Sequence, residues 1–307
     1  MAVRDGAVRR AAWSLAHAVG RVLGSPAARR TARLVGFFEG LSDAGVHRIA
    51  LRISPRVADQ NPELVKIPPT WSTTVLVRRQ GVGLELDLRD NLQAILYYAG
   101  RYEPAVRRFL RAELQKGDVV LDVGANIGVH ALTVAKRLEE LGGGRVIAVE
   151  PAADCVAKLG TAAARNGLPL EVVPAALGEW KQHASLRADS RYDPADAGVR
   201  SLYGDGAIVQ EVPVIRLDDW ARKHALTRLD VVKLDIEGGE IAALSGATRT
   251  LKRLQPRALL VEDKRSGSSA RLHTILNELG YLPAGEVLDH NALFRPESLL
   301  TASIGRR

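Results

Sequence analysis

The sequence has few of the residues that mark secreted, membrane-spanning or nucleic-acid-binding chains. Its 307 residues include one cysteine, Cys155, so no disulfide can form within the chain. No apolar run approaches the ~20 residues that a membrane-spanning helix needs. Aromatic residues make up 5% of the chain and do not alternate with basic ones, which argues against a nucleic-acid surface. The pattern favours a globular protein with a core of ordinary size.

The net charge of +8 comes largely from arginines near the two ends of the chain. Arginines precede the apolar stretch Ala11 to Val19, as in a signal peptide, but His17 and Arg21 give the segment the period of a basic amphipathic helix. We therefore predict a basic, mainly helical extension over residues 1–71, before a domain over 72–307. The helix would either dock on that domain or contact an anionic membrane surface, and we expect a cytoplasmic protein.

One stretch, from Val119 to Gly128, organises the domain. Its first half reads as a buried parallel strand, which ends in two spaced glycines before a helical pattern begins. This strand, turn and helix start are typical of a nucleotide-type site. A dinucleotide fingerprint would read G-x-G-x-x-G, but here the order is D-x-G-x-N-x-G. The carboxylate would repel a pyrophosphate and suit a cation, so we predict S-adenosylmethionine, with Asp122 near its ammonium end through water or backbone. The donor-binding residues predicted from this stretch are Asp122, Gly124, Ala125, Asn126 and Gly128.

Glu150 ends the next predicted strand, Arg145 to Val149, and lies twenty-two residues after Gly128. A carboxylate at that position can accept hydrogen bonds from both ribose hydroxyls of a nucleoside. Ala176 and Leu177 follow the third strand, where an adenine ring would lie.

A second informative stretch is Lys233-Leu234-Asp235-Ile236-Glu237-Gly238-Gly239-Glu240, in which a strand ends at Asp235. Methyl transfer needs a group that removes the acceptor's proton, and Asp235 is the first candidate and Glu237 the second. Lys233 would orient a carboxylate or lower the pKa of an acceptor hydroxyl. Alternatively, the two acids cap the following helix, whose N-terminus favours negative charge.

The remaining chain alternates strands and helices, which predicts a doubly wound α/β sheet. A hairpin is expected between Thr73 and Leu88, and a second one, Leu282 to Val287 with Ala292 to Phe294, would close the sheet. Lys181 to Gln210 reads as a long polar connector that could bear on specificity.

Three stretches in order resemble the FkbM family of S-adenosylmethionine-dependent methyltransferases. They are Gly100-Arg101-Tyr102-Glu103-Pro104, the D-x-G-A-N-x-G stretch with Glu150-Pro151, and the K-x-D-x-E-G stretch at Lys233. The resemblance covers roughly Thr73 to Phe294, with a core at about 100–296, and Gly238-Gly239 is a mild departure from the family pattern.

This resemblance implies a class I, Rossmann-like fold with seven strands, the last antiparallel. It also implies methyl transfer, usually to oxygen, on sugars, glycolipids or polyketide-type natural products, with Glu103 near the methionine end of the donor. As in catechol-type methyltransferases, Asp235 and Glu262 end neighbouring strands and would be the ligands if Mg²⁺ binds.

Two other classes of function stay open from the sequence. An NAD-dependent oxidoreductase would also use Glu150 but lacks the G-x-G-x-x-G order. A non-catalytic, membrane-peripheral binding module would explain the basic N-terminal helix and leave Asp122 and Asp235 without a role.

Overall fold

A computed structural model of the chain describes residues 74–87, 90, 92–93, 96–97, 102–189, 197–263 and 269–304. The predicted helical extension over residues 1–71 lies outside these ranges, as do Gly100 and Arg101 of the first family stretch. The division into residues 1–71 and 72–307 therefore stays a prediction. The chain forms two compact units, and the larger one, residues 80–85 and 103–307, contains the central sheet.

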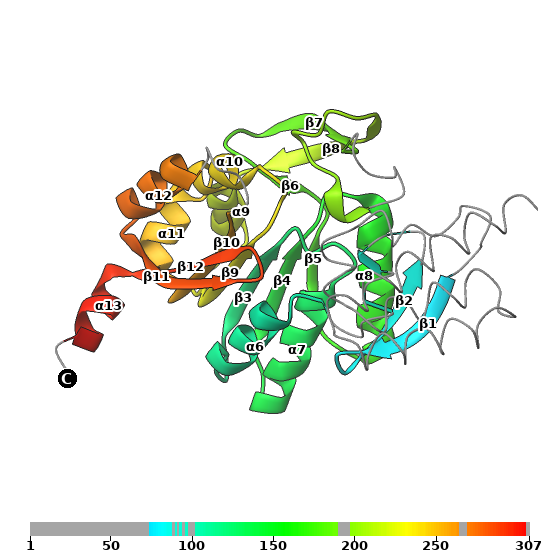
Figure 1. The fold of residues 1–307 in the computed structure, drawn as a ribbon, viewed down its shortest axis with the longest axis horizontal. Helices are drawn as coiled ribbons and strands as arrows, with labels where there is room; N and C mark the ends of the chain where they lie inside the picture. The colour runs from blue at the N-terminus through cyan, green and yellow to red at the C-terminus, as the bar shows by residue number, and fades with distance from the viewer. Residues whose placement is uncertain are drawn as a thin grey trace, which may run out of the picture. The chain divides into compact units, whose positions relative to one another are not determined.

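The central sheet has the seven strands, the last of them antiparallel, that the resemblance implies (Figure 1). Across the sheet the strands are β11 (Tyr281–Leu288), β12 (Asn291–Pro296), β10 (Ala258–Glu262), β9 (Val231–Leu234), β3 (Val119–Val123), β4 (Arg145–Val149) and β5 (Glu171–Val173). The pairs from β10 to β5 are parallel, and β12 runs antiparallel to both neighbours. The chain leaves β3 toward β4 and β5 and returns to β9 on the other side of β3. This reversal creates a switch point, where doubly wound sheets bind ligands.

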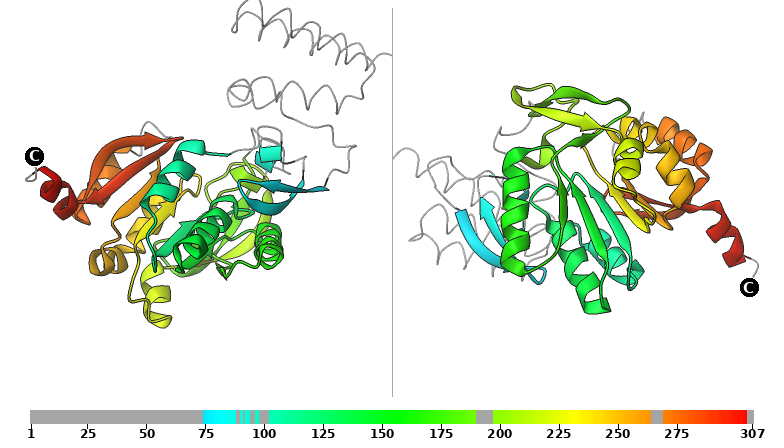
Figure 2. Two further views of the ribbon diagram at one scale, coloured as in Figure 1. Left: turned by 90° about the horizontal axis from the view of Figure 1, so that it is seen from below. Right: turned by 180° about the vertical axis from the view of Figure 1, so that it is seen from behind.

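Helices flank the sheet in two groups (Figures 1 and 2). The first group is α6 (Pro104–Glu113), α7 (Val129–Leu141) and α8 (Ala153–Asn166), and the second is α9 (Leu217–Lys223), α10 (Glu240–Ser245), α11 (Thr248–Leu254) and α12 (Ser269–Glu278). Every residue of β9 and β10 is buried, as expected for strands covered on both faces. Helix α13 (Glu297–Ile304) follows β12 and was not predicted. No helix in the described part of the chain is long and apolar enough to cross a bilayer.

The expected helix from Gly239 to Leu254 is two helices, α10 and α11. The break falls at Gly246, where a Cβ would overlap the carbonyl oxygen of Gly178. After it, the carboxylate of Asp218 accepts hydrogen bonds from the N–H groups of Arg249 (3.1 Å) and Thr250 (2.7 Å) at the start of α11. The helical spacing of apolar residues continues across this region of the sequence. The helix is nevertheless interrupted by the close contact at Gly246 and by the Asp218 cap, which lies far away in the sequence.

The described part of the polar connector Lys181 to Gln210 includes strands, which its composition did not indicate. It contains β7 (Gln182–Arg187) and the start of β8 (Ile208–Ile215), which pair antiparallel. With β6 (Ala176–Leu177) they form a separate three-stranded sheet in the order β6-β8-β7. The short helix η2 (Ala197–Val199) lies between β7 and β8.

The predicted N-terminal hairpin is present as β1 (Thr74–Arg79) and β2 (Val82–Asp87). Its two turn residues, Gln80 and Gly81, have φ of 51° and 89°, as a two-residue hairpin loop requires.

Charged residues form a network at the end of the sheet where β3, β9 and β10 begin. Asp118 is 0% exposed and binds both terminal nitrogens of Arg257, at 3.1 and 2.6 Å. Arg257 also contacts Glu113, which pairs in turn with Arg295 at 2.8 Å. These contacts join α6, β10 and β12, and they hold the pKa of Glu113 below its ordinary value despite its partial burial.

Removing the buried carboxylate of this network should destabilise the fold. We expect Asp118→Ala to lower the free energy of unfolding by about 3 kcal/mol, because it leaves Arg257 without its buried partner. Urea unfolding measures this. The matched control is Asp219→Ala, whose pair with Arg222 is exposed and should contribute less than about 1 kcal/mol. Equal effects for the two substitutions would contradict a structural role for the network.

Candidate functional site

The loop between β3 and α7 passes close against the end of β9. Gly124, Asn126 and Gly128 all have positive φ, at 80°, 50° and 88°. The N–H groups of Gly124 and Ala125 both donate to the carbonyl of Val149, at 2.9 and 3.1 Å. A Cβ on Gly124 would overlap the carbonyl oxygen of Asp235. The D-x-G-x-N-x-G motif therefore brings the ends of β3, β4 and β9 together at the switch point.

Glu150 is held at the tip of β4 by two backbone donors. The N–H of Asn126 donates to one carboxylate oxygen at 2.8 Å and the N–H of Ala152 to the other at 2.9 Å. The residue is 7% exposed, and burial raises its pKa to about 7, although the two N–H groups act in the opposite direction. Each carboxylate oxygen can accept more than one hydrogen bond. The geometry thus leaves one acceptor position on each oxygen for a neighbouring hydroxyl.

A cavity opens where these strands end, and it collects residues from distant parts of the chain. Among the predicted site residues, its lining includes Gly124, Asn126, Glu150, Ala176, Leu177, Asp235 and Glu237. The other predicted site residues do not belong to its described lining; these are Glu103, Asp122, Ala125, Gly128, Lys233 and Glu262. The first set lines the space that a ligand would occupy, and the second set lies outside that lining.

Lys233 is the centre of a buried polar cluster beside this cavity. Its Nζ lies 2.7 Å from Oδ2 of Asp235 and 3.7 Å from Oε2 of Glu103. The same Glu103 oxygen lies 2.7 Å from Nε2 of His130. Burial alone would lower the pKa of Lys233, but the carboxylates of Asp235, Glu103 and Asp122 raise it above the ordinary lysine value. The lysine is therefore a fixed cation that holds the Asp235 carboxylate in place.

Asp122 lies opposite Lys233 in the register of β3 and β9. It is 3% exposed, and neither carboxylate oxygen has a hydrogen-bond partner among the described residues. Burial raises its pKa, and Lys233 offsets this only in part. Asp122 is thus a buried carboxyl group that lies outside the described lining of the cavity.

Glu103 does not cap the helix that it precedes. It has a φ of 39° and directs its carboxylate to His130 and Lys233. The carboxylate of Asp289, in the turn between β11 and β12, accepts the N–H groups of Ala105 (2.6 Å) and Val106 (3.1 Å) instead. A distant residue caps α6 and leaves Glu103 for the buried cluster.

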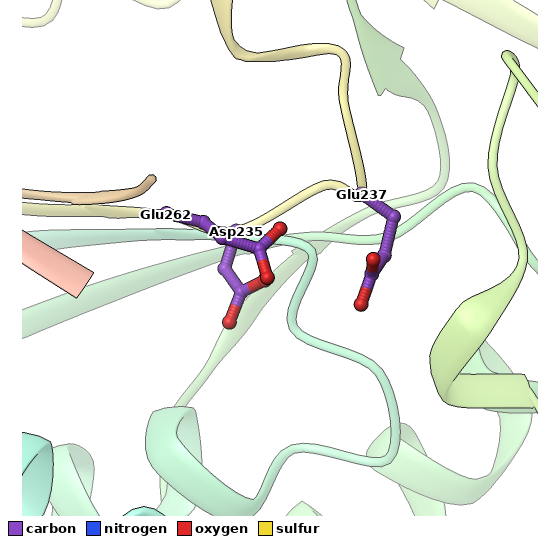
Figure 3. A group of neighbouring side chains, drawn as sticks. All are labelled: Asp235, Glu237 and Glu262. Carbon is purple, nitrogen blue, oxygen red and sulfur yellow. The ribbon is translucent and has the colours of Figure 1, made fainter. Parts of the chain in front are cut away.

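Carboxylates of Asp235, Glu237 and Glu262 lie near one another at the ends of β9 and β10 (Figure 3). One oxygen from each falls within 4.8 Å of the others. Helix α10 has no side-chain cap, so neither Asp235 nor Glu237 caps it. The carboxylate of Glu240, its first residue, accepts the N–H groups of Ile236 (3.2 Å) and Gly238 (3.1 Å) in the turn before the helix. The arrangement brings the predicted pair Asp235 and Glu262 together with Glu237.

Among the cavity residues that sequence reasoning missed are three with polar side chains: Arg200, Ser201 and Tyr203. Arg200 donates from Nη1 to both carboxylate oxygens of Asp154, at 2.9 Å each. The three come from the connector between β7 and β8, which is rich in Asp, Gly and Ser. Its composition indicates a loop near the site but not which side chains enter the cavity.

The fold and the site define a class of protein: a doubly wound α/β protein with an acidic cavity at its switch point. The profile of the methyltransferase FkbM domain matches residues 122–283, just over half of the chain. The chain therefore belongs to the FkbM family of methyltransferases, as the three sequence stretches predicted.

Individual relatives match parts of the chain. The hexuronic acid methyltransferase AglP of Haloferax volcanii is 30% identical over 155 residues, which are 50% of this chain and 59% of that protein. The methyltransferase sdnD of Sordaria araneosa is 23% identical over 203 residues, which are 55% of this chain and 76% of that protein. A crystal structure of an FkbM methyltransferase from Methylobacillus flagellatus is 18% identical, with a TM-score of 0.42, over 59% of this chain and 44% of that one. The chain thus matches less than two thirds of the Haloferax protein and less than half of the Methylobacillus one.

Substitution of the first loop glycine should disrupt the site. In Gly124→Ala the new Cβ meets a backbone oxygen at positive φ, and we expect a loss of at least about 2 kcal/mol in the free energy of unfolding. The control is Gly167→Ala, also at positive φ (64°) but with no atom within 4 Å of the added Cβ. That variant should lose about 1 kcal/mol from backbone strain alone. Equal losses in urea unfolding would contradict the close approach of Gly124 to Asp235.

Proposed function

We propose that this protein is an S-adenosylmethionine-dependent methyltransferase that methylates a hydroxyl oxygen of a sugar, glycolipid or polyketide-type natural product. The observation that carries the proposal is the Glu150 carboxylate, fixed by two backbone N–H groups at the edge of an acidic cavity. Family membership supports methyl transfer, and the Haloferax relative, named as a hexuronic acid methyltransferase, supports a sugar as the acceptor.

The charges around the cavity suit this donor. The charged residues in its described lining are Glu150, Asp235, Glu237 and Arg200, and Arg200 is paired with Asp154. Asp122, which is buried, and Glu103, whose side chain is 10% exposed, lie behind them, with Lys233 as the cation between. An ammonium and a sulfonium are stabilised by this excess of carboxylates, whereas the pyrophosphate of NAD would be repelled. The charge pattern therefore favours the methyl donor over the oxidoreductase alternative.

Each predicted donor-binding residue can be given a role. Glu150 would accept the ribose hydroxyls, Ala176 and Leu177 would pack against the adenine, and the loop from Gly124 to Gly128 would pass beside the methionine part. Glu103 and Asp122 lie outside the described cavity lining, so Asp122 would act near the ammonium through water or backbone and Glu103 near the methionine end. When bound, S-adenosylmethionine supplies a methyl group on a cationic sulfur and leaves as a neutral thioether.

On the acceptor side, Asp235 would remove the hydroxyl proton as the new oxygen–carbon bond forms. Lys233 holds the Asp235 carboxylate at 2.7 Å and so would fix its direction. Glu237 lines the same cavity and is the second candidate. Mg²⁺ at Asp235 and Glu262 stays a prediction from the sequence. The ammonium of Lys233 already neutralises the Asp235 carboxylate, which argues against a metal ion there.

Donor binding should depend on pH through Glu150. The carboxylate accepts hydroxyls best when ionised, so protonation below pH 7 should weaken binding of S-adenosylhomocysteine. Titration calorimetry should give a Kd about tenfold higher at pH 6 than at pH 8. In Glu150→Gln the Kd should rise about 10- to 100-fold, and the pH dependence should disappear. Glu278→Gln, on an exposed face of α12, is the control.

The same titration separates the alternatives. Wild-type binding of S-adenosylhomocysteine that does not depend on pH would contradict the role of Glu150 in binding the ribose. A Glu150→Gln variant that binds this ligand as tightly as wild type would contradict it too. Tight binding of NAD in place of S-adenosylhomocysteine would support the oxidoreductase. Donor binding without methyl transfer to any hydroxyl acceptor would support the non-catalytic module.

Asp235→Asn should separate catalysis from donor binding. The amide keeps the shape of the side chain but cannot take a proton, so the rate of methyl transfer should fall about 100-fold or more. The affinity for S-adenosylhomocysteine should change by less than about threefold. The rate is measured as transfer of radiolabelled methyl groups to a panel of methyl glycosides. A variant with an unchanged rate would exclude Asp235 as the base and leave Glu237 as the candidate.

A further inference from the structure

A pocket away from the donor cavity lies between helices α6 and α7, which run side by side, and the hairpin turn at Gly81 (Figures 1 and 2). Its described lining belongs wholly to the larger unit and shares no residue with the donor cavity. On α7 the lining runs from Thr133 to Glu140, whereas the donor loop ends at Gly128, before the helix begins. Lys136 therefore lies about 12 Å along the helix from that loop. A ligand in this pocket would not displace the methyl donor.

The pocket carries an excess of positive charge. Its described lining contains four cationic side chains, Arg107, Arg111, Lys136 and Arg137. The one acidic residue of that lining is Glu140, which lies 3.5 Å from Nη1 of Arg111 and 3.4 Å from Nη1 of Arg137. Two guanidinium groups thus share a single carboxylate. Four cations against one carboxylate leave a net charge of +3 in the described lining.

Two of these cations have no acidic partner. The side chains of Arg107 and Lys136 form neither an ion pair nor a hydrogen bond within the described chain, and both residues are half-buried. The Nε atom of Arg107 is buried without a hydrogen-bond partner among the described residues. Burying a guanidinium group without a partner is costly, and no protein contact offsets the cost here. An anion that accepts hydrogen bonds from the terminal nitrogens of Arg107 would offset it.

Helix dipoles do not account for these two positions. A cation in the last turn of a helix is stabilised by the negative end of the helix dipole, and Arg111 has this place in α6. Arg107 lies one turn earlier in α6, and Lys136 lies in the middle of α7, which has no basic residue in its last turn. Solvation does not account for them either. Arg108, the neighbour of Arg107, is exposed and lies outside the lining, as an ordinary surface arginine does.

The pocket also has an apolar floor. Leu110, Leu114 and Val134 belong to its lining and are buried. The stem of Lys136 lies along the hairpin turn, since a Cβ on Gly81 would stand 3.5 Å from its Cε. The pocket has a volume of about 380 Å³, which is within the range of small-molecule sites. A ligand with an anionic group and an apolar part matches both the charge and the floor.

We propose that this pocket binds an organic phosphate. Arg107, Lys136 and Arg137 hold the phosphate group, whose oxygens accept hydrogen bonds from guanidinium and ammonium groups. The organic part lies over Leu110 and Val134. Soluble phosphate esters and phospholipid head groups present the same anion, and the experiment separates the two sources. The site does not depend on the proposed function, because it shares no residue with the donor cavity.

Phenyl phosphate is the probe, because it joins a phosphate group to a flat apolar ring. Titration calorimetry on the full chain should give a Kd that rises about tenfold or more in Arg107→Gln, which removes a cation without an acidic partner. Glu140→Gln should lower the Kd about threefold, because it removes the carboxylate that Arg111 and Arg137 share. A purely structural role of these residues would not move the affinity in opposite directions.

The matched control is Arg108→Gln, which removes the same charge from the same helix outside the pocket. Its Kd for phenyl phosphate should change less than about twofold. Urea unfolding checks that Arg107→Gln is folded, and we expect a midpoint like that of wild type because Arg107 makes no side-chain hydrogen bond within the described chain. Saturation with S-adenosylhomocysteine should leave the Kd unchanged, since the two pockets are separate.

Cosedimentation with vesicles identifies the source of the phosphate. Binding to phosphatidylcholine vesicles that contain phosphatidate, but not to phosphatidylcholine alone, would assign a lipid head group if Arg107→Gln abolishes it. Binding of phenyl phosphate that the same substitution weakens would assign a soluble ester, and either result supports the site. Absence of both kinds of binding would overturn it. Equal losses in Arg107→Gln and Arg108→Gln, or competition between phenyl phosphate and S-adenosylhomocysteine, would overturn it as well.

Discussion

The burial of one ammonium among carboxylates is the constraint on which the site depends. Lys233 is 4% exposed in the middle of the sheet, a position that costs several kcal/mol unless opposite charges surround it. Asp235, Glu103 and Asp122 provide those charges from β9, the start of α6 and β3. Since three carboxylates surround one lysine, and His130 contacts Glu103, the cluster fixes the direction of Asp235 and leaves negative potential beside the cavity. A cationic donor is the ligand that such a potential favours.

The positions of the other site residues depend on close backbone contacts at the switch point of the sheet. Gly124 lets β3 approach the end of β9, and the same loop offers the N–H of Asn126 to Glu150. The carboxylate that would hold the ribose is thus positioned by the turn that would bind the rest of the donor. The Tyr203 loop adds a second wall, tied through Ser201 to the carbonyl of Glu237. The cavity is therefore bordered by two loops that hydrogen bonds hold in place.

Much of this could be predicted from the sequence because its strongest signals are local. The β3 run with its glycines and the alternation of strands and helices predicted a doubly wound sheet, and the family resemblance implied seven strands. The structure confirms both. Long-range contacts could not be read in this way. The break between α10 and α11 depends on the approach of Gly178 to Gly246, the cap of α6 comes from Asp289, and Tyr203 enters the site from a connector without periodicity. Asp122 was predicted from its spacing, but its burial behind the cavity depends on Lys233 across the sheet.

A crystal structure of the protein with S-adenosylhomocysteine tests the central claim most directly. The account predicts the adenine against Ala176 and Leu177, both ribose hydroxyls on the Glu150 carboxylate, and the ammonium on the side of the cavity that faces the Lys233 cluster. It also predicts that the sulfur lies nearer to Asp235 than to Glu150. A ligand bound elsewhere, or one whose ammonium points away from the carboxylates around Lys233, would contradict the account.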